Sequence, residues 1–206
     1  MGKTDFPFEA GDSLKYWQNT LQIKTPMKPE RKQITTNNLV GDYELSDLSW
    51  EFDIREFESW AVDKFIIHSA DGTSNNSVYL LFMVNAAKVL QGGFNGEDPS
   101  NSALRLIQVI DGKVTLLGTF DEETARGKGY SVKITCKDNN IDVWFGAKRT
   151  GKLEKVISAK ADEKLASGQV LIESFNSNMW LDNIKISNSA NGTDKDYDKS
   201  LYATVK

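Results

Sequence analysis

Hydrophobic and polar residues alternate with a period of two along most of this chain, and helical periodicity is nearly absent. Residues 50–55 read Trp-Glu-Phe-Asp-Ile-Arg, which places apolar side chains on one face of a strand and polar ones on the other. The segment 78–84 is apolar on both faces and predicts a central, fully buried strand. The pattern therefore predicts an all-β fold, a two-sheet antiparallel sandwich.

Turn signals separate the expected strands. Asp111-Gly112 lies between the apolar runs 104–110 and 114–117 and predicts a hairpin. Residues 137–140, Lys-Asp-Asn-Asn, predict a second hairpin between 130–136 and 141–145. The segment 161–166, closed by Gly168, predicts the one helical turn. The remaining expected strands are 6–8, 21–23, 42–45, 48–57, 64–68, 155–157, 170–175 and 179–186.

The composition changes after Ser187, which predicts a domain boundary there. Residues 1–187 form one expected β-sandwich, since such sandwiches run to roughly 200–250 residues as one unit. Residues 188–206 begin as a polar linker and end in a short apolar stretch at 201–205. This C-terminal tail is either disordered or adds a strand to an edge of this or a neighbouring molecule, which would give self-association.

The net charge, the apolar runs and the counts of cysteine and histidine argue against several classes of function. The net charge of -4 over 206 residues does not favour nucleic-acid binding or a basic membrane surface. No apolar run approaches the roughly 20 residues of a transmembrane helix. Cys136 is the single cysteine, so no intrachain disulfide forms, and alternation predicts that it is buried. His68 is the single histidine, which argues against a multi-histidine zinc site.

Several segments resemble the concanavalin A-like lectin and glucanase superfamily. Residues 6–12 with Trp17 resemble the first strand of many such domains, and 41–45 followed by 50–55 resemble a glycine and a long amphipathic strand. The segments 130–134, 141–145, 168–172 and 180–186 are similar to the C-terminal half of laminin G-like modules and of 3-keto-disaccharide hydrolase-like domains. The resemblance covers about residues 5–187 and implies a jelly-roll sandwich, a fold that hosts lectins, glycosidases, adhesion modules and structural proteins.

Residues 51–56 resemble the Glu-x-Asp-x-x-Glu motif of glycoside hydrolase family 16. The resemblance implies that Glu51 is a nucleophile, Asp53 tunes it, and Glu56 is the acid/base. A retaining glycosidase needs two carboxyls about 5–5.5 Å apart. The motif lies one strand too early in the chain, however, because the Gly-aromatic-Glu segment at 41–44 precedes it almost directly. We therefore assign no catalytic residue, and a glycosidase remains an alternative.

The resemblance also implies one structural Ca²⁺ near the meeting of the first and last strands. Glu9 and Asp182 match the metal-ligating places of the pattern, and Asp12 and Asn183 could assist. Carboxylate and carbonyl oxygens are the ligands that Ca²⁺ prefers. The alternative is a turn carboxylate and a strand-end aspartate with ordinary hydrogen bonds.

Sugar binding requires an aromatic platform beside hydrogen-bonding groups, because sugars offer apolar C–H faces and polar rims. Trp144 and Phe145 are adjacent on a strand, so one of them must face away from the core. The candidate ligand-binding residues are Trp144, Trp60 in a loop-like stretch, and Phe94, Asn95 and Glu97 in the loop 91–100. For each aromatic the alternative is core packing.

These observations predict a non-catalytic, lectin-like or adhesion-type domain that binds a glycan, located outside the cell or on its surface. Met1–Asp5 contain no hydrophobic signal segment, so either a leader peptide is absent from this sequence or the protein is cytosolic. A structural or assembly protein, whose strand 201–205 pairs with a neighbouring subunit, is the second hypothesis. A glycoside hydrolase related to family 16 or to the 3-keto-disaccharide hydrolase-like domains is the third.

Overall fold

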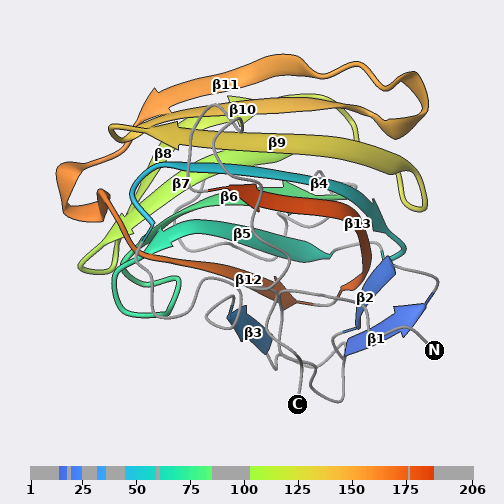
Figure 1. The fold of residues 1–206 in the computed structure, drawn as a ribbon, viewed down its shortest axis with the longest axis horizontal. Helices are drawn as coiled ribbons and strands as arrows, with labels where there is room; N and C mark the ends of the chain where they lie inside the picture. Colours follow the sequence, from blue (N-terminus) through green and yellow to red (C-terminus); the bar gives the residue numbers. More distant parts are fainter. Residues whose placement is uncertain are drawn as a thin grey trace.

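The computed structural model describes residues 14–17, 20–24, 32–35, 45–58, 61–84, 103–175 and 177–187. In this part of the chain the strands form two antiparallel sheets that pack face to face (Figure 1). The predicted all-β, two-sheet antiparallel sandwich is therefore confirmed. None of the described residues forms a helix long and apolar enough to cross a membrane.

Strands that are distant in the sequence become neighbours in both sheets. In spatial order, the 7-stranded sheet contains β1 (Leu14–Trp17), β2 (Thr20–Lys24), β13 (Asn178–Ser187), β4 (Leu48–Glu56), β9 (Gly129–Lys137), β10 (Asn140–Ala147) and β11 (Glu154–Lys160). The 6-stranded sheet contains β3 (Lys32–Thr35), β12 (Gln169–Phe175), β5 (Val62–Ser69), β6 (Ser77–Met83), β7 (Leu104–Ile110) and β8 (Lys113–Phe120). Two short 3-10 helices, η2 (Lys148–Thr150) and η3 (Glu163–Leu165), lie in connections.

Both predicted hairpins are confirmed by their turn residues. Asp111 and Gly112, between β7 and β8, have φ angles of 51° and 74°, and Asp138 and Asn139, between β9 and β10, have 48° and 63°. Two consecutive left-handed residues match the right-handed twist of the flanking strands, and Gly, Asn and Asp adopt this conformation most readily. The predicted helical turn is the single turn of η3.

Two strands were not predicted. β1 and β3 have four residues each and lie at one edge of their respective sheets. A strand this short gives too little alternation for the period to stand out. The expected strand 6–8 and the tail 188–206, with its proposed self-association, lie outside the described residues.

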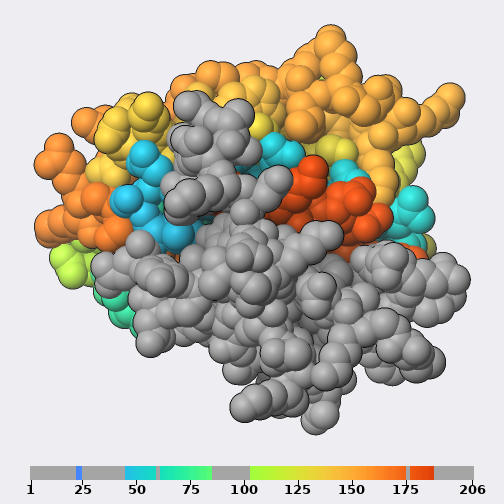
Figure 2. All heavy atoms as spheres, viewed as in Figure 1, coloured from blue at the N-terminus to red at the C-terminus, as the bar shows by residue number. Residues whose placement is uncertain are grey.

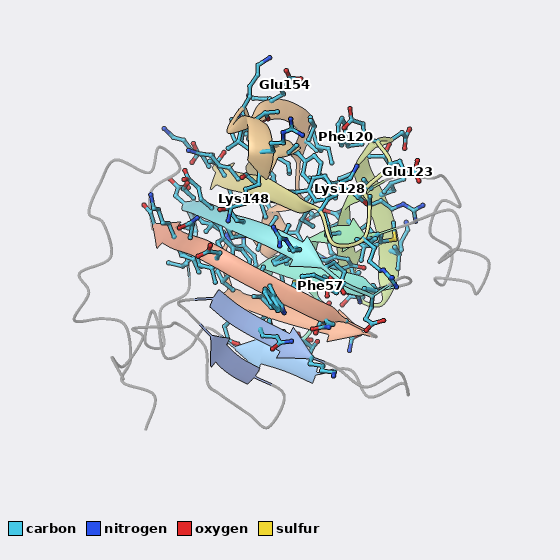
Figure 3. All side chains as sticks on the ribbon, turned by 90° about the vertical axis from the view of Figure 1, so that its right-hand side faces the viewer. Phe57, Phe120, Glu123, Lys128, Lys148 and Glu154 are labelled. Atoms are coloured by element: carbon cyan, nitrogen blue, oxygen red, sulfur yellow. The ribbon has the colours of Figure 1, made fainter. Side chains whose placement is uncertain are left out.

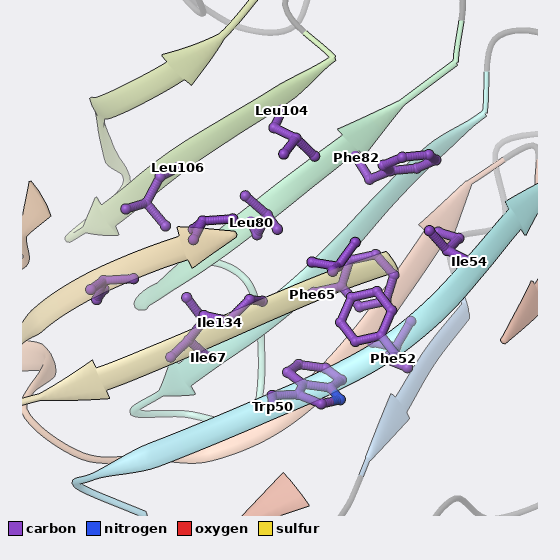
Figure 4. Close-up of a cluster of buried hydrophobic side chains, with 14 of the residues drawn as sticks. Trp50, Phe52, Ile54, Phe65, Ile67, Leu80, Phe82, Leu104, Leu106 and Ile134 are labelled. Carbon is purple, nitrogen blue, oxygen red and sulfur yellow. The ribbon is translucent and has the colours of Figure 1, made fainter. Parts of the chain in front are cut away.

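The core lies between the two sheets and is centred on aromatic side chains (Figure 4). Trp50 and Phe52 of β4 meet Phe65 of β5, with ring centroids 5.6 Å apart for Trp50–Phe65 and 4.3 Å apart for Phe52–Phe65. Cys136 is buried, as predicted. His68 is also fully buried, and its Nδ1 lies 2.9 Å from the carbonyl oxygen of Leu165.

The two sheets differ in their outer faces. The outer face of β5, β6, β7 and β12 in the 6-stranded sheet is buried and largely apolar, with Ile66, Leu81 and Ile107 among its residues. The outer face of the 7-stranded sheet carries the polar positions of β4, including Glu51 and Asp53. This second face, which we call the polar face, therefore presents the accessible hydrogen-bonding groups.

Candidate functional site

A pocket of about 190 Å³ lies on the polar face. Its lining comes from β4 (Asp53, Ile54, Arg55), β13 (Trp180, Asp182), β9 (Gly129) and η2 (Lys148). The three strands are hydrogen-bonded neighbours, because β4 pairs with β13 on one side and with β9 on the other. In Figure 2 the surface of β13, in red, lies beside that of β4, in cyan.

A network of charged and polar side chains, some buried and some exposed, forms one side of the pocket. The Nζ of Lys148 lies 3.0 Å from Oδ2 of Asp53 and 3.2 Å from Oδ2 of Asp182, so one ammonium bridges two carboxylates. The Ser131 hydroxyl donates to Oδ1 of Asp53 at 2.5 Å, and the Asn183 side-chain amide donates to Oδ2 at 2.6 Å. We call these five residues the Lys148 cluster.

An irregularity in β13 brings Asn183 into this cluster. Asp182 is paired with Asp53, whereas Lys185 is paired with Glu51, so β13 contains one residue more than β4 between the two pairs. A β-bulge of this kind re-aims side chains, and in β13 it includes Asn183 at a left-handed φ of 52°. Asparagine tolerates that conformation better than most residues. The bulge thus adds an amide donor to the carboxylate of Asp53.

Lys148 reaches the two aspartates by crossing β9. It is the first residue of η2, directly after β10, and Gly129 of β9 lies beneath its side chain. A Cβ on Gly129 would lie 3.3 Å from Cβ of Lys148, which is tighter than most such contacts. The absence of a side chain at Gly129 therefore leaves room for the aliphatic part of Lys148. Figure 3 shows Lys148 on the same side of the sheet as Phe57.

Lys148 and Asp53 are both ionised at neutral pH. Burial alone would raise the pKa of Asp53, but hydrogen bonds from Ser131, Asn183 and Lys148 outweigh it and lower the pKa below its usual range. Burial alone would lower the pKa of Lys148, but Asp53 and Asp182 outweigh it and raise the pKa. The ammonium and the Asp53 carboxylate are therefore both charged in the folded protein.

The other side of the pocket is aromatic. Trp180 packs against Phe57, with ring centroids 4.9 Å apart, and both side chains are half-buried. Arg55 is the cross-strand partner of Trp180 and is exposed beside it. The pocket thus combines an apolar surface with a guanidinium, an ammonium and two carboxylates.

A second aromatic position lies farther along the polar face. Phe145 is in the core and Trp144 faces outward, which confirms that one of the two neighbours looks away from the core. The Nζ atoms of Lys133 and Lys155 lie 5.9 Å and 5.1 Å from the Trp144 ring centroid. Such cation–π contacts hold the half-buried indole of Trp144 in place.

The two glutamates of the family 16-like motif, Glu51 and Glu56, do not lie on the same face of β4. Glu51 lies on the polar face, where it pairs with Lys133 at 2.7 Å, and Asp53 belongs to the Lys148 cluster. Glu56 points to the opposite face of β4 and is 1% exposed. A glycosidase needs both carboxyls beside the same glycosidic bond, and residues 51 and 56 do not meet that condition.

Glu56 instead belongs to a buried carboxyl pair with Asp63 at the end of the core. Glu56 accepts hydrogen bonds from the backbone N–H groups of Glu58 (2.6 Å) and Asn178 (2.9 Å) and from the Ser177 hydroxyl (2.7 Å). Asp63 is fully buried. Burial first, and then the charge of Glu56, raise the pKa of Asp63 well above its usual range. We interpret the pair as an ionised Glu56 beside a protonated Asp63.

Asp182, one of the two predicted calcium ligands, contacts Lys148, whose ammonium lies between Asp53 and Asp182. Among the described residues, no three or more His, Cys, Asp or Glu side chains form a group that could hold a metal ion. Glu9 lies outside the described residues, so a calcium site that includes it stays a prediction.

The remaining predicted ligand-binding residues, Trp60, Phe94, Asn95 and Glu97, also lie outside the described residues. Sequence reasoning missed Arg55, Lys148 and Trp180. The alternation in 50–55 did place Arg55 on the polar side of its strand. No comparable signal pointed to Lys148, because its position depends on the turn after β10.

Comparisons with known proteins show the fold but no close relative. No family model matches the sequence, and no curated protein matches it. Among solved structures, the carbohydrate-binding module CBM66 from Bacillus subtilis aligns with a TM-score of 0.61 and 12% identity, over 84% of this chain and 90% of that one.

Two further structures extend this likeness. The exoplasmic/lumenal domain of VIP36, in a Ca²⁺/Man-bound form, aligns with a TM-score of 0.59 and 9% identity, over 92% of this chain and 85% of that one. A xylan β-1,4-xylosidase from Bacillus halodurans C-125 aligns with a TM-score of 0.54 and 11% identity, over 82% of this chain and 32% of that one. The described chain therefore has the concanavalin A-like jelly-roll fold that the sequence resemblance implied.

Proposed function

We propose that this protein binds carbohydrate on the polar face of its 7-stranded sheet, at the pocket between Trp180 and the Lys148 cluster. The observation that carries the proposal is the composition of this pocket. Trp180, which lines the pocket and packs against Phe57, offers an apolar surface to the C–H face of a sugar ring. Lys148, Asp53 and Asp182 offer charged donors and acceptors to its hydroxyl groups.

The size of the pocket limits how much of a glycan enters it. Typical small-molecule sites enclose roughly 300–1,000 Å³, and this pocket holds about 190 Å³. We therefore expect one terminal or protruding sugar unit to occupy it, with the rest of the glycan on the open face. Trp144, farther along the same face, is a candidate for a second contact.

The structural neighbours support this class of function. One is a carbohydrate-binding module and another is a lectin domain in a mannose-bound form. We propose binding without hydrolysis, because Glu51 and Glu56 lie on opposite faces of β4. The location outside the cell or on its surface remains a prediction from this fold type.

The proposal is tested by affinity electrophoresis in gels that contain single polysaccharides: levan, xylan, β-glucan, mannan and polygalacturonate. We expect at least one to retard the protein, and Trp180→Ala to weaken that binding by about 2 kcal/mol or more, which is roughly 30-fold. Leu116→Ala, an exposed apolar truncation on the other sheet, is the matched control and should bind normally. Circular dichroism would verify that both variants are folded.

Three results would count against parts of this proposal. Retardation by none of the polysaccharides would contradict carbohydrate binding. Loss of binding in Trp144→Ala but not in Trp180→Ala would move the site along the polar face. Release of reducing sugar from the bound polysaccharide, abolished by Glu51→Gln, would favour the glycosidase alternative.

A further inference from the structure

On the polar face of the described chain, every carboxylate of β4, β10 and β13 contacts a lysine, but not every cation contacts a carboxylate. Each of its carboxylates on β4, β10 and β13 contacts a lysine: Glu51 contacts Lys133 (2.7 Å), Asp142 contacts Lys155 (2.7 Å), and Asp53 and Asp182 share Lys148 (3.0 and 3.2 Å). Three lysines therefore offset most, but not all, of the charge of these four carboxylates. The positive groups are not all used in this way.

Arg55 is the clearest case. It is exposed, it lines the pocket, and its neighbours across the strands are Trp180 on one side and Gly129 on the other. Within the described residues its guanidinium makes no hydrogen bond and no ion pair. Lys185, also exposed on β13, is likewise outside any ion pair of the described chain. Arg55 and Lys185 are therefore cations of the polar face that no carboxylate in the described part of the chain contacts, although the whole chain carries -4.

A guanidinium in this position is suited to a particular ligand group. Its planar fork of N–H donors matches a carboxylate with two parallel hydrogen bonds, whereas a neutral hydroxyl uses only one of them. Because Arg55 is the cross-strand partner of Trp180, a sugar ring that contacts the indole would bring its exocyclic group near the guanidinium. A neutral sugar would form its hydrogen bonds with the Lys148 cluster alone, and it would offer no carboxylate to Arg55.

We propose that the sugar bound at this pocket is a uronic acid unit of an acidic polysaccharide, and that Arg55 binds its carboxylate. This inference rests on the proposed function, since it names the class of glycan for the same pocket. Arg55 is then the residue that distinguishes acidic from neutral glycans, and Trp180 contributes to binding of either class.

Isothermal titration calorimetry can separate the two contributions. The probes are polygalacturonate, alginate and hyaluronan as polyuronates, fully methyl-esterified polygalacturonate as the matched neutral polymer, and dextran sulfate as a sulfated polyanion. We expect at least one polyuronate to bind, and Arg55→Gln to weaken it roughly 10- to 100-fold, the range of a lost charge-assisted hydrogen-bond pair. Arg55→Lys should bind more tightly than Arg55→Gln but less tightly than the original protein, because lysine keeps the positive charge but lacks the two parallel N–H donors of the guanidinium.

Lys113→Gln is the control for charge alone, since Lys113 is exposed at the start of β8 on the other sheet. It should leave the dissociation constant within about twofold of the original. Raising the salt concentration from about 0.05 to 0.5 M should weaken polyuronate binding, because exposed charges are screened. Methyl esterification should weaken binding to a similar degree as Arg55→Gln.

The outcomes distinguish this inference from the proposed function. If a neutral polysaccharide binds in a Trp180-dependent way and Arg55→Gln has no effect, the inference is wrong and carbohydrate binding stands. If dextran sulfate binds as well as the polyuronates, and Lys113→Gln weakens binding as much as Arg55→Gln, the attraction is non-specific and the inference is wrong. If no polysaccharide of either class binds, both fail together.

Discussion

The buried pair Glu56–Asp63 makes the stability of this protein depend on pH in a predictable direction. Asp63 is fully buried, and the side chains of Glu56 and Ser177 are its polar neighbours. Glu56 has three donors, namely the N–H groups of Glu58 and Asn178 and the hydroxyl of Ser177. Burial raises the pKa of both carboxyls, but the three donors oppose the rise at Glu56, so the negative charge is held on Glu56 and the proton on Asp63.

The direction follows from proton linkage. Burial and the charge of Glu56 raise the pKa of Asp63 in the folded state, whereas the unfolded chain has the ordinary value of about 3.9. Between these two pKa values the folded state binds more protons than the unfolded state. Stability from this group is thus complete at low pH and is lost as the pH rises, by up to about 1.4 kcal/mol per pH unit, until the folded pKa is passed.

Asp63→Asn removes this dependence without changing the size of the side chain. The amide supplies a permanent N–H donor to Glu56 and takes up no proton. We therefore expect Asp63→Asn and the original protein to have similar free energies of unfolding near pH 5. The variant should become the more stable of the two as the pH rises to 8, and the gap should widen with the slope that linkage sets for one proton.

Urea unfolding at pH 5, 6, 7 and 8, followed by circular dichroism, measures this difference. The fully buried His68, whose pKa burial lowers, contributes a pH dependence of the opposite sign, but it is present in both proteins and cancels in the comparison. Glu56→Gln is the matched control. It removes the anion that three donors stabilise, so it should destabilise by about 1–3 kcal/mol at every pH tested. A difference between Asp63→Asn and the original protein that is constant from pH 5 to 8 would refute the linkage argument.

Three further predictions concern the core, the Lys148 cluster and the cysteine. Trp50→Ala should lower the free energy of unfolding by about 3–5 kcal/mol in urea titrations, because the indole is fully buried against Phe52 and Phe65. Lys148→Met should raise the pKa of Asp53, measured by NMR titration of its carboxyl carbon, while lowering stability by only about 1 kcal/mol or less because the lysine is 41% exposed. Cys136 should react with a thiol reagent only after unfolding, since burial raises the pKa of its thiol to about 12; rapid reaction of the folded protein would contradict its burial.

Much of the fold could be predicted from the sequence because alternation and turn chemistry are local properties. The period of two in residues 50–55 correctly assigned each side of β4, and the Asp-Gly pair at 111–112 correctly located a hairpin. The same reasoning placed Trp144 and Phe145 on opposite faces. Local patterns determine which face of a strand a residue occupies, and in these strands they were sufficient.

The composition of the site could not be predicted in the same way, because it depends on which strands are neighbours. β4 lies between β13 and β9, which are distant in the sequence, and this arrangement alone brings Trp180 beside Arg55. The bulge that places Asn183 against Asp53 is a matter of register between β4 and β13. Neither the neighbours of a strand nor its register can be read from the strand by itself.

Lys148 lies beside Asp182, one of the two residues that the sequence analysis expected to bind a calcium ion. Two carboxylates on one face repel each other and require a cation between them, and the protein supplies that cation as an ammonium. An ammonium has three N–H donors, of which the contacts to Asp53 and Asp182 use two. Under the proposed function the third is available to a sugar hydroxyl, within a group that both carboxylates already fix in place. One side chain thus bridges the two aspartates and presents a donor to the pocket.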